Sequence, residues 1–402
     1  MMVILPAIIA FAFAWWLTGR LCSPRSFFLM LDHPNDRTLH HMPTPRNGGL
    51  AIVTSVVISL LAAASVVAIL RPSVPVLPKG LASGSLWIVA SMLLVFVISF
   101  IDDWIGLPAS LRFAIQTAAA LIIIGGVGLT LSSIPIPGGQ NIQLGWMAGP
   151  VSAIFLLWMA NLYNFMDGMD GFAGGMTAIG FGFLAYFGWE AGSPVMLMIA
   201  TFVAMSALGF LVHNFPPARI FMGDAGSITV GFLGGALILL GVRDGMFDFW
   251  VPIILFSPFI LDATVTLIRR ALRFEKLWEA HREHYYQRVV LSGWSHRRTV
   301  FAEYAIMVLC GGLAILYQNA TDGKRWVILA TWLMMFLSIG GMVKMLEQRS
   351  KRKGLHASCA SHVTTGTQTC NPLTTASPGV VRGQGGEGCA SPQEERATMP
   401  RL

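Results

Sequence analysis

The chain has 402 residues, of which 54% are apolar and only 12% are charged, about half the charged fraction of an ordinary soluble domain. This composition excludes a soluble globular enzyme. The five cysteines predict neither a disulfide framework nor a zinc site, because they show no paired or metal-ligand spacing.

Long apolar runs recur along the chain, and each is close to the roughly 20 residues that a helix needs to cross a bilayer. They predict an all-α fold, a polytopic integral membrane helical bundle, because lipid offers backbone groups no partner outside their own helix. The first run is expected to be retained as a span rather than cleaved as a signal, since no basic segment precedes it. Eleven spans are predicted, with ten as the alternative, at residues 2–21, 48–70, 85–101, 112–131, 148–165, 172–188, 194–212, 225–242, 248–268, 300–318 and 326–343.

The distribution of basic residues predicts how the bundle lies in the membrane. All but five of the 27 Lys and Arg residues fall on the side of the first loop, and the opposite side keeps Arg71, Lys79, Arg243, Lys324 and Arg325. The positive-inside rule then puts the N-terminus outside and the C-terminus in the cytoplasm. The same bias accounts for the net charge of +7, so no nucleic-acid partner is expected.

Two domains are predicted. Residues 1–346 form a multi-span membrane domain with its active-site loops on the cytoplasmic side, and residues 347–402 form a tail that is basic at first and then of low complexity. From about Gly354 onward the tail is rich in Ser, Thr, Gly and Pro with few aromatic residues, which predicts disorder.

Five polar clusters fall on the predicted cytoplasmic side, and the one at Asn161 to Gly175 organises the others. It ends an apolar span with two amides and two carboxylates, which are costly at a membrane boundary. Asn161, Asn164, Asp167 and Asp170 recur every three residues, and the Asp-Gly pairs are expected to fold back over the last helical turn. A polar connector that caps two helices is the alternative. The other clusters are residues 32–49, 102–112, 213–227 and 281–298, so one shared site is predicted.

Acidic residues stand at the predicted span ends, namely Asp102, Asp103, Asp167, Asp170 and Asp224. Hard oxygen ligands beside Arg and His suit Mg²⁺ with a phosphorylated substrate, because Mg²⁺ takes few protein oxygens and completes its shell with phosphate and water. The adjacent Asp102 and Asp103 repel, which suits one of them to act as a base, and a solvated helix terminus is the alternative. Asp224 opens the eighth span and is expected either to cap that helix or to reach the metal.

The loop after the ninth span holds His281, Arg282, His284 and Arg288, which are suited to clamping a pyrophosphate. A zinc site is a competing interpretation, but no third soft ligand lies nearby in the sequence. A basic loop that faces lipid headgroups is the other alternative.

Taken in order, these motifs resemble those of the polyprenyl-phosphate N-acetylhexosamine-1-phosphate transferases, glycosyltransferase family 4. That family includes the peptidoglycan-precursor translocase and the enzymes that initiate O-antigen and enterobacterial common antigen synthesis. The resemblance covers about residues 20 to 300 and rests on Pro43 to Gly49, the Asp102-Asp103 pair, Asn161 to Gly171, Phe221 to Ser227 and the histidine loop.

The resemblance implies roles for individual residues. Asn164 and Asp224 look like ligands of Mg²⁺, with Mn²⁺ as the alternative ion. The catalytic acids it implies are Asp102 and Asp103, which match a pair that handles the lipid phosphate, and Asp167 and Asp170, which match a segment near the nucleotide. The substrate contacts it implies are Arg46 and Arg112 near phosphates, Asn214 and Phe221 around the uracil, and His281, Arg282 and His284 in the histidine loop.

The histidine loop reads His-Arg-Glu-His where the peptidoglycan enzyme has three consecutive histidines, so it looks more like the O-antigen initiating branch. The expected reaction transfers an N-acetylhexosamine-1-phosphate from a UDP-N-acetylated amino sugar to undecaprenyl phosphate and releases UMP. The enzyme is expected in the lipid bilayer of the bacterial inner membrane, with its active site on the cytoplasmic face. The sugar and the oligomeric state, including a homodimer, are left open. The alternative function is an ion-coupled secondary transporter, which predicts acids near the bilayer midplane.

Overall fold

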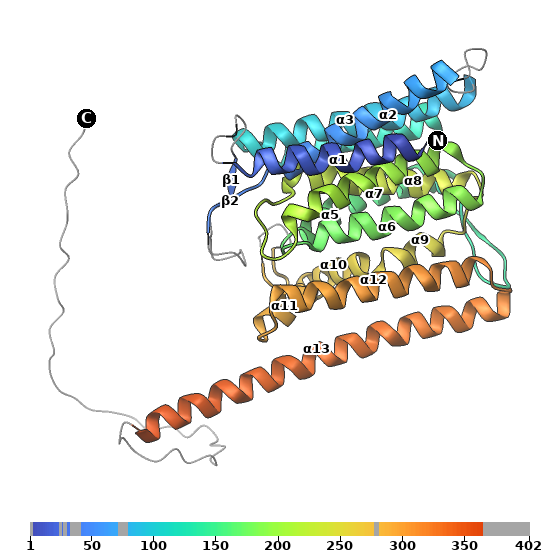
Figure 1. The fold of residues 1–402 in the computed structure, drawn as a ribbon. Helices are drawn as coiled ribbons and strands as arrows, with labels where there is room; N and C mark the ends of the chain where they lie inside the picture. The colour runs from blue at the N-terminus through green and yellow to red at the C-terminus, as the bar shows by residue number, and fades with distance from the viewer. Residues whose placement is uncertain are drawn as a thin grey trace. The chain divides into compact units, whose positions relative to one another are not determined.

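Thirteen α-helices, one short 3₁₀ helix and two strand pairs form the described part of the chain, and they confirm the predicted all-α membrane fold (Figure 1). The computed structural model describes residues 3–23, 26, 30–32, 42–70, 79–276 and 281–364, with the backbone alone at residues 70, 79–83 and 353–364. The helices are α1 Ile4–Leu21, α2 Gly48–Leu70, α3 Lys79–Ile105, α4 Ala109–Val127, η1 Gly145–Met147, α5 Ala148–Met166, α6 Phe172–Glu190, α7 Pro194–Asn214, α8 Gly223–Arg243, α9 Trp250–Leu255, α10 Ser257–Leu272, α11 Tyr285–Leu291, α12 His296–Gln318 and α13 Asp322–Thr364. The strands are β1 Leu31–Asp32, β2 Thr44–Pro45, β3 Ser133–Ile134 and β4 Ile142–Gln143.

Ten helices among the described residues are long and apolar enough to cross a membrane, and each predicted span except the ninth corresponds to one of them. The ninth, predicted as one helix over 248–268, is broken at Phe256 into α9 and α10. Pro258 has no N–H to donate, and the N–H groups of Phe259 and Ile260 both bond to the Phe256 carbonyl, at 3.1 and 2.9 Å. Neither half is long enough to count as a span, which leaves the alternative number of ten.

Helix α8 is the centre of the bundle. It packs against α2, α3, α5 and α6, and 94% of the residues in its most apolar stretch are buried inside the protein. Glycines allow the close approach: Gly231 lies against the backbone of Met159 and Ala160 in α5, and Gly226 lies against Gly49 at the start of α2. The first turn of α8 is therefore surrounded by the ends of other helices.

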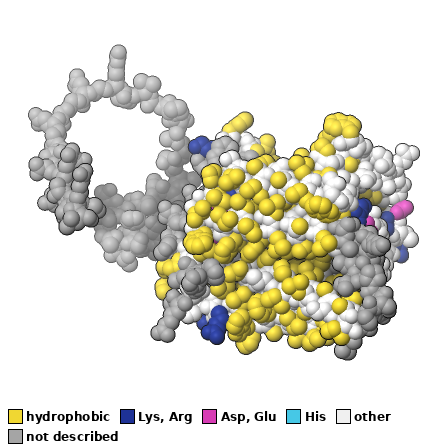
Figure 2. Space-filling model, turned by 90° about the horizontal axis from the view of Figure 1, so that it is seen from above, with side chains coloured by type: hydrophobic (Ala, Val, Ile, Leu, Met, Phe, Trp, Pro, Cys, Tyr) yellow, Lys and Arg dark blue, Asp and Glu magenta, His cyan; other side chains and the backbone are white. Residues whose placement is uncertain are grey.

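The outer surface is apolar. Large side chains of the first three helices, such as Trp15, Trp16, Leu61 and Trp87, are exposed. Hydrophobic side chains cover most of the face shown in Figure 2, and charged side chains lie near its ends. An exposed apolar surface of this extent fits a lipid environment.

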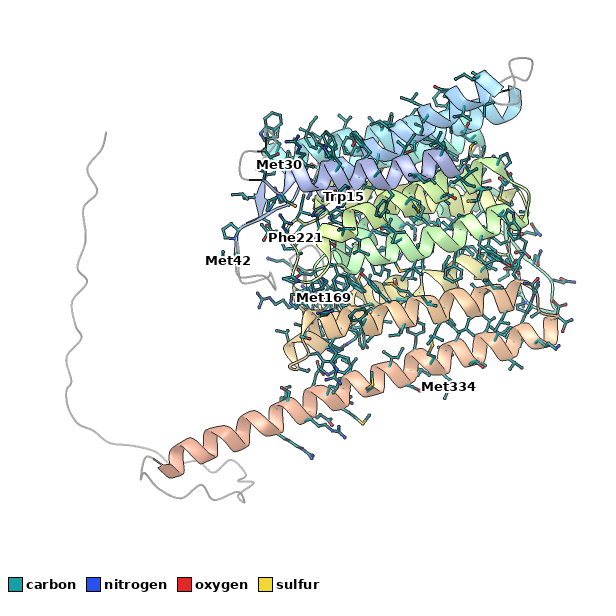
Figure 3. The ribbon with its side chains drawn as sticks, viewed as in Figure 1. Trp15, Met30, Met42, Met169, Phe221 and Met334 are labelled. Atoms are coloured by element: carbon teal, nitrogen blue, oxygen red, sulfur yellow. The ribbon has the colours of Figure 1, made fainter. Side chains whose placement is uncertain are left out.

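The described parts of the polar clusters meet at one end of the bundle. Helices α2, α6, α8 and α12 begin at this end, and α3, α5, α7 and α10 end there (Figure 1). Strands β1 and β2 pair antiparallel beside them, with Leu31 opposite Pro45, and Figure 3 shows Met30, Phe221 and Met169 at the same end. Residues 33–41 of the first cluster lie outside the described residues. The cytoplasmic orientation of this end stays a prediction from the charge distribution.

Helix α13 continues to Thr364, past Gly354 where the sequence predicts the start of a disordered tail. The chain divides into one unit at Met1–Ser350 and another at Lys351–Leu402. Residues 365–402 lie outside the described part, so their expected disorder stays a prediction.

Candidate active site

Asp102 and Arg112 form the side of the site that comes from α3 and α4. One carboxylate oxygen of Asp102 accepts from the backbone N–H of Leu107 at 2.7 Å, and the other accepts from Arg112 Nη1 at 2.6 Å. The same guanidinium nitrogen lies 3.4 Å from Asp224 Oδ2. Arg112 therefore links two carboxylates that belong to helices far apart in the sequence.

Asp103 caps the first turn of α8 from a neighbouring helix. Its carboxylate accepts from the backbone N–H groups of Ala225 at 2.9 Å and Asp224 at 3.4 Å. A negative charge is stabilised at this position because the N-terminus of a helix is the positive end of its dipole. Arg46 completes the contact by donating from Nη2 to the Asp103 carbonyl oxygen at 2.7 Å.

The Asp224 side chain faces the site, because Asp103 accepts the hydrogen bonds that cap α8. No side chain at the start of α8 caps the helix from within, and Asp224 Oδ1 instead accepts from Asn164 Nδ2 at 2.8 Å. The same Asn164 amide donates to Ser227 Oγ at 3.2 Å. Of the two roles predicted for Asp224, the structure does not show the helix cap, and the metal ligand stays a prediction.

Asp167 follows α5 and joins this group, which we call the acid cluster: Asp102, Asp103, Asp167 and Asp224. The backbone N–H of Gly223 is close enough to the Asp167 carboxylate to stabilise its charged form. Burial first, and then the nearby charges of Asp224 and Asp103, raise the pKa of Asp167 well above its usual range. Among the described residues, Arg46 and Arg112 are the basic residues that pair with these four acids, so the cluster is an attractive place for a cation.

The acid cluster suits Mg²⁺ better than a metal that needs a full set of protein ligands. Among the described residues, no three His, Cys, Asp or Glu side chains are arranged to hold an ion together. Mg²⁺ does not require such a set, because it binds through one or two carboxylates plus phosphate and water. Asn164 points its NH₂ group at Asp224, so to act as a ligand its amide must turn and present the oxygen.

Asp170 and Asn214 lie beside the acid cluster and hold loops together. Asp170 Oδ2 accepts from the backbone N–H of Ala218 at 3.0 Å and lies 3.6 Å from His296 Nδ1. The buried Asn214 amide accepts from the Gly171 N–H at 3.0 Å and donates to the Ile220 carbonyl at 2.8 Å. The sequence grouped Asp170 with Asn164 and Asp167, whereas the structure gives Asp170 contacts to Ala218 and His296. The predicted role of Asn214 near the uracil stays a prediction.

Phe221 ties the start of α2 to the start of α8 through its backbone. Its N–H donates to the Pro45 carbonyl at 2.7 Å, and its carbonyl accepts from the Gly48 N–H at 2.9 Å. Gly49 extends this pairing by donating to the Met222 carbonyl at 2.7 Å. The Pro43 to Gly49 motif thus acts as a brace between β1 and the loop before α8.

The histidine segment, residues 281–291, is arranged around Asp262 of α10. His284 is 3% exposed, and its Nδ1 lies 3.1 Å from Asp262 Oδ1. His281 is half-buried, and its Nδ1 accepts from the backbone N–H of Glu283 at 3.3 Å. Arg288, expected in the pyrophosphate clamp, instead forms a two-point ion pair with Glu347 of α13 at 2.6 and 2.7 Å.

His281 should be neutral at physiological pH. Burial, then the charges of His284 and Arg270, lower the pKa of His281 to about 4, while Glu283 and Asp262 act in the opposite direction. The unfolded chain binds this proton near pH 6.5, so between about pH 4 and 6.5 it holds more protons than the folded state, and stability should fall on acidification. We expect the melting temperature to fall less steeply over this range in His281→Gln than in wild type. Equal slopes would contradict the shift.

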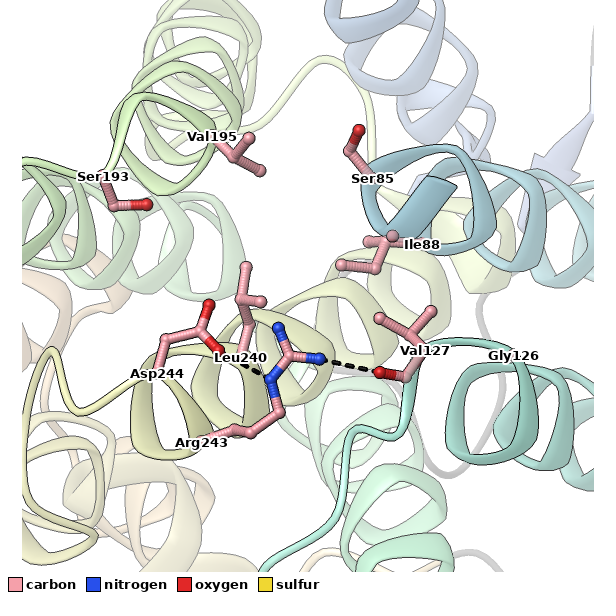
Figure 4. A pocket seen from close by; sticks show the side chains of 10 residues that line it. Ser85, Ile88, Gly126, Val127, Ser193, Val195, Leu240, Arg243 and Asp244 are labelled. Atoms are coloured by element: carbon pink, nitrogen blue, oxygen red, sulfur yellow. Dashed lines mark hydrogen bonds and ion pairs between the residues drawn. The ribbon is translucent and has the colours of Figure 1, made fainter. Parts of the chain in front are cut away.

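A polar cavity of about 150 Å³ lies at the other end of the bundle (Figure 4). It is lined by the ends of α3, α4, α7 and α8, and Arg243 crosses it to reach Asp244 Oδ1 at 2.6 Å and the Val127 carbonyl at 2.8 Å. Since α8 runs from Gly223, next to Asp224 of the acid cluster, to Arg243 at this cavity, the cavity is separate from the candidate site.

Comparison with known proteins identifies the family. Residues 85–242 match the model of glycosyl transferase family 4. The chain is 31% identical over 310 residues to a probable undecaprenyl-phosphate N-acetylglucosaminyl 1-phosphate transferase of Bacillus subtilis (strain 168), covering 76% of this chain and 80% of that protein. The chain belongs to glycosyl transferase family 4.

Two further relatives of this family 4 transferase carry different names. A decaprenyl-phosphate N-acetylglucosaminephosphotransferase of Mycolicibacterium smegmatis is 31% identical over 302 residues, covering 69% of this chain and 72% of that protein. A phospho-N-acetylmuramoyl-pentapeptide-transferase of Synechococcus sp. (strain JA-3-3Ab) is 30% identical over 265 residues, covering 60% and 74%. Identity alone therefore does not distinguish the sugar donor. The secondary-transporter alternative finds no support among these transferases.

Three polar residues with contacts near the site of this family 4 transferase were not predicted from the sequence. Asp262 anchors the histidine segment, Gln116 of α4 accepts from Asn161 Nδ2 at 3.1 Å, and Glu303 of α12 lies close enough to Asp262 for their charges to repel. Each lies inside a predicted span. A polar side chain within an apolar run was the signal that could have found them.

Proposed function

We propose that this protein transfers an N-acetylhexosamine-1-phosphate from a UDP-sugar to undecaprenyl phosphate at the cytoplasmic face of the bacterial inner membrane. An oxygen of the lipid phosphate attacks the β-phosphorus of the donor. The bond between that phosphorus and the bridging oxygen breaks, and UMP leaves with the electron pair. The product is the lipid-linked pyrophosphoryl sugar that starts O-antigen or another cell-envelope polysaccharide.

The observation that supports this most is the convergence of Asp102, Asp224 and Asn164, from three helices, around Arg112. Arg112 lies within 3.4 Å of both carboxylates, and Asn164 lies within 2.8 Å of Asp224. Phosphoryl transfer needs mainly positioning and charge stabilisation, and clustered carboxylates beside a fixed guanidinium support both. Arg46 and Arg112 are each about one-third exposed, so both can reach a phosphate at the surface of the cluster.

Mg²⁺, with Mn²⁺ as the alternative, would be held by Asp224 and a turned Asn164, and would offset the charge on the donor's phosphates. Asp102 and Asp103 already accept hydrogen bonds from Arg112, Leu107 and Ala225, which favours steering the lipid phosphate over removing a proton from it. A phosphate monoester is largely ionised near pH 7 and needs little help from a base.

UMP release by the purified protein tests the proposal. The assay contains undecaprenyl phosphate and, in turn, UDP-N-acetylglucosamine, UDP-N-acetylfucosamine, UDP-N-acetylquinovosamine and UDP-N-acetylmuramoyl-pentapeptide. We expect lipid-dependent release with at least one of the three amino sugars, complete loss with a chelator, and recovery on adding Mg²⁺. A folded protein that releases no UMP from any donor would contradict the proposal, and activity only with the muramoyl donor would contradict the branch.

A further inference from the structure

Asp262 is a buried acid that satisfies an unusual number of donors. It lies in α10, six residues after the break at Phe256, and is 9% exposed. Its Oδ1 accepts from the backbone N–H of Tyr285 at 2.9 Å, from Thr266 Oγ1 at 3.2 Å and from His284 Nδ1 at 3.1 Å. Its Oδ2 accepts from the Tyr286 N–H at 3.2 Å. One carboxylate thus connects α10 to the first turn of α11.

These contacts assign different duties to the two histidines. The His284 ring is buried, and its Nδ1–H donates a hydrogen bond to Asp262. A carboxylate partner of this kind fixes the tautomer and orientation of a histidine. The Nδ1 of His281 accepts a hydrogen bond, so the proton of its neutral ring is on Nε2 and is available to donate. The first N–H groups of α11 are also occupied by Asp262. The donor that this geometry leaves for an anion is His281 Nε2, and Arg282 stays the contact that the sequence predicts.

The start of α11 lies against the loop that carries Asp167. A side chain on Gly168 would overlap the Tyr286 hydroxyl, so Tyr286 of α11 packs directly against this loop. Gln287 accepts from the His284 N–H at 3.3 Å, which closes the first turn of the helix. A movement of α11 would therefore displace the loop that carries Asp167 of the acid cluster.

We propose that Asp262 is a positioning residue, which holds His284 and the start of α11 so that His281 and Arg282 are presented to the phosphorylated donor. This rests on the proposed function. The carboxylate oxygens of Asp262 already accept hydrogen bonds from backbone and side-chain groups of the protein, so Asp262 does not touch the UDP-sugar. Its effect passes through the histidine segment.

The test compares Asp262→Asn with a matched control, Asp248→Asn. Asp248 lies at the other end of the bundle, where it also caps a helix, accepting from the Trp250 N–H at 3.0 Å, and lies 3.7 Å from Arg325. In Asp262→Asn we expect the KM for the UDP-sugar to rise roughly 10-fold, with the KM for the lipid little changed, because loss of an orienting partner has effects of this size. Adding His284→Ala to Asp262→Asn should cost no more than His284→Ala alone, since the two act as a unit. The control should keep wild-type kinetics.

Hydrogen exchange separates this inference from the proposed function. Asp262→Asn should increase deuterium uptake in peptides covering residues 281–291 and leave the rest unchanged, whether or not any UDP-sugar is turned over. Asp248→Asn should do so only near residues 248–255. Unchanged exchange at 281–291, a normal KM for the donor, or independent effects of Asp262 and His284 would each overturn the positioning role. Inactive wild-type protein would overturn the proposed function instead.

Discussion

Replacing Asp224 with Asn is expected to lower UMP release by at least about 100-fold while the protein still folds. The fold should survive because Asp103, not Asp224, caps α8, and the backbone N–H groups of Asp224 and Ala225 keep their partner. The new amide has the same shape but no charge, so it holds a divalent cation poorly and no longer attracts Arg112. The measurement is initial-rate UMP release at saturating Mg²⁺, with the melting temperature recorded in the same detergent.

Asp244→Asn is the control for this prediction, because Asp244 follows the other end of the same helix and pairs with Arg243 at 2.6 Å. It should leave turnover within about 2-fold of wild type, since a surface ion pair contributes little. Full activity in Asp224→Asn would show that the divalent cation, if required, is held by other residues.

The positions of the spans could be predicted from the sequence because each spanning helix is apolar along its own length, whether its neighbours are lipid or other helices. Apolar runs of about 20 residues carry that signal locally, and nothing distant has to be known. The break at Phe256 could not be predicted from the apolar pattern. Residues 248–268 form the same apolar run whether Pro258 kinks one long helix or lies in the first turn of a second helix. The two-residue strands β1 to β4 are too short to show the alternation that marks a strand.

The sequence predicted which residues lie together in the site, but not which hydrogen bonds they form with one another. Residue type and position predicted that Asn164, Asp102 and Asp224 share a cleft, and the structure brings them together. The choice of Asp103 as the cap of α8 depends on a contact between residues 122 positions apart, which no local pattern contains. For the same reason, the regular spacing of Asp170 with Asn164 and Asp167 did not reveal that Asp170 turns toward Ala218.

Gly223→Ala is expected to lower both the melting temperature and turnover, because this glycine faces two constraints. Its φ of +73° lies in the left-handed region, where an alanine costs about 1 to 2 kcal/mol. An added Cβ would also overlap the Arg46 carbonyl oxygen and come within 3.1 Å of Asp103 Oδ2. Relieving the overlap must shift either the Arg46 segment, which contacts Asp103, or the first turn of α8, which carries Asp224. A displacement of about 1 Å can cost as much as 100-fold in rate.

Gly245→Ala separates these two constraints. Gly245 follows the far end of α8 with a similar φ of +66°, but nothing lies within 4 Å of the position its Cβ would take. Both variants should lose stability from backbone strain, whereas only Gly223→Ala should lose turnover, by more than about 10-fold, because only there does the new methyl group press on the site. Suppose that the two variants lose the same amount of stability and both keep wild-type turnover. The close contacts of Gly223 with Arg46 and Asp103 would then not control the geometry of the acid cluster.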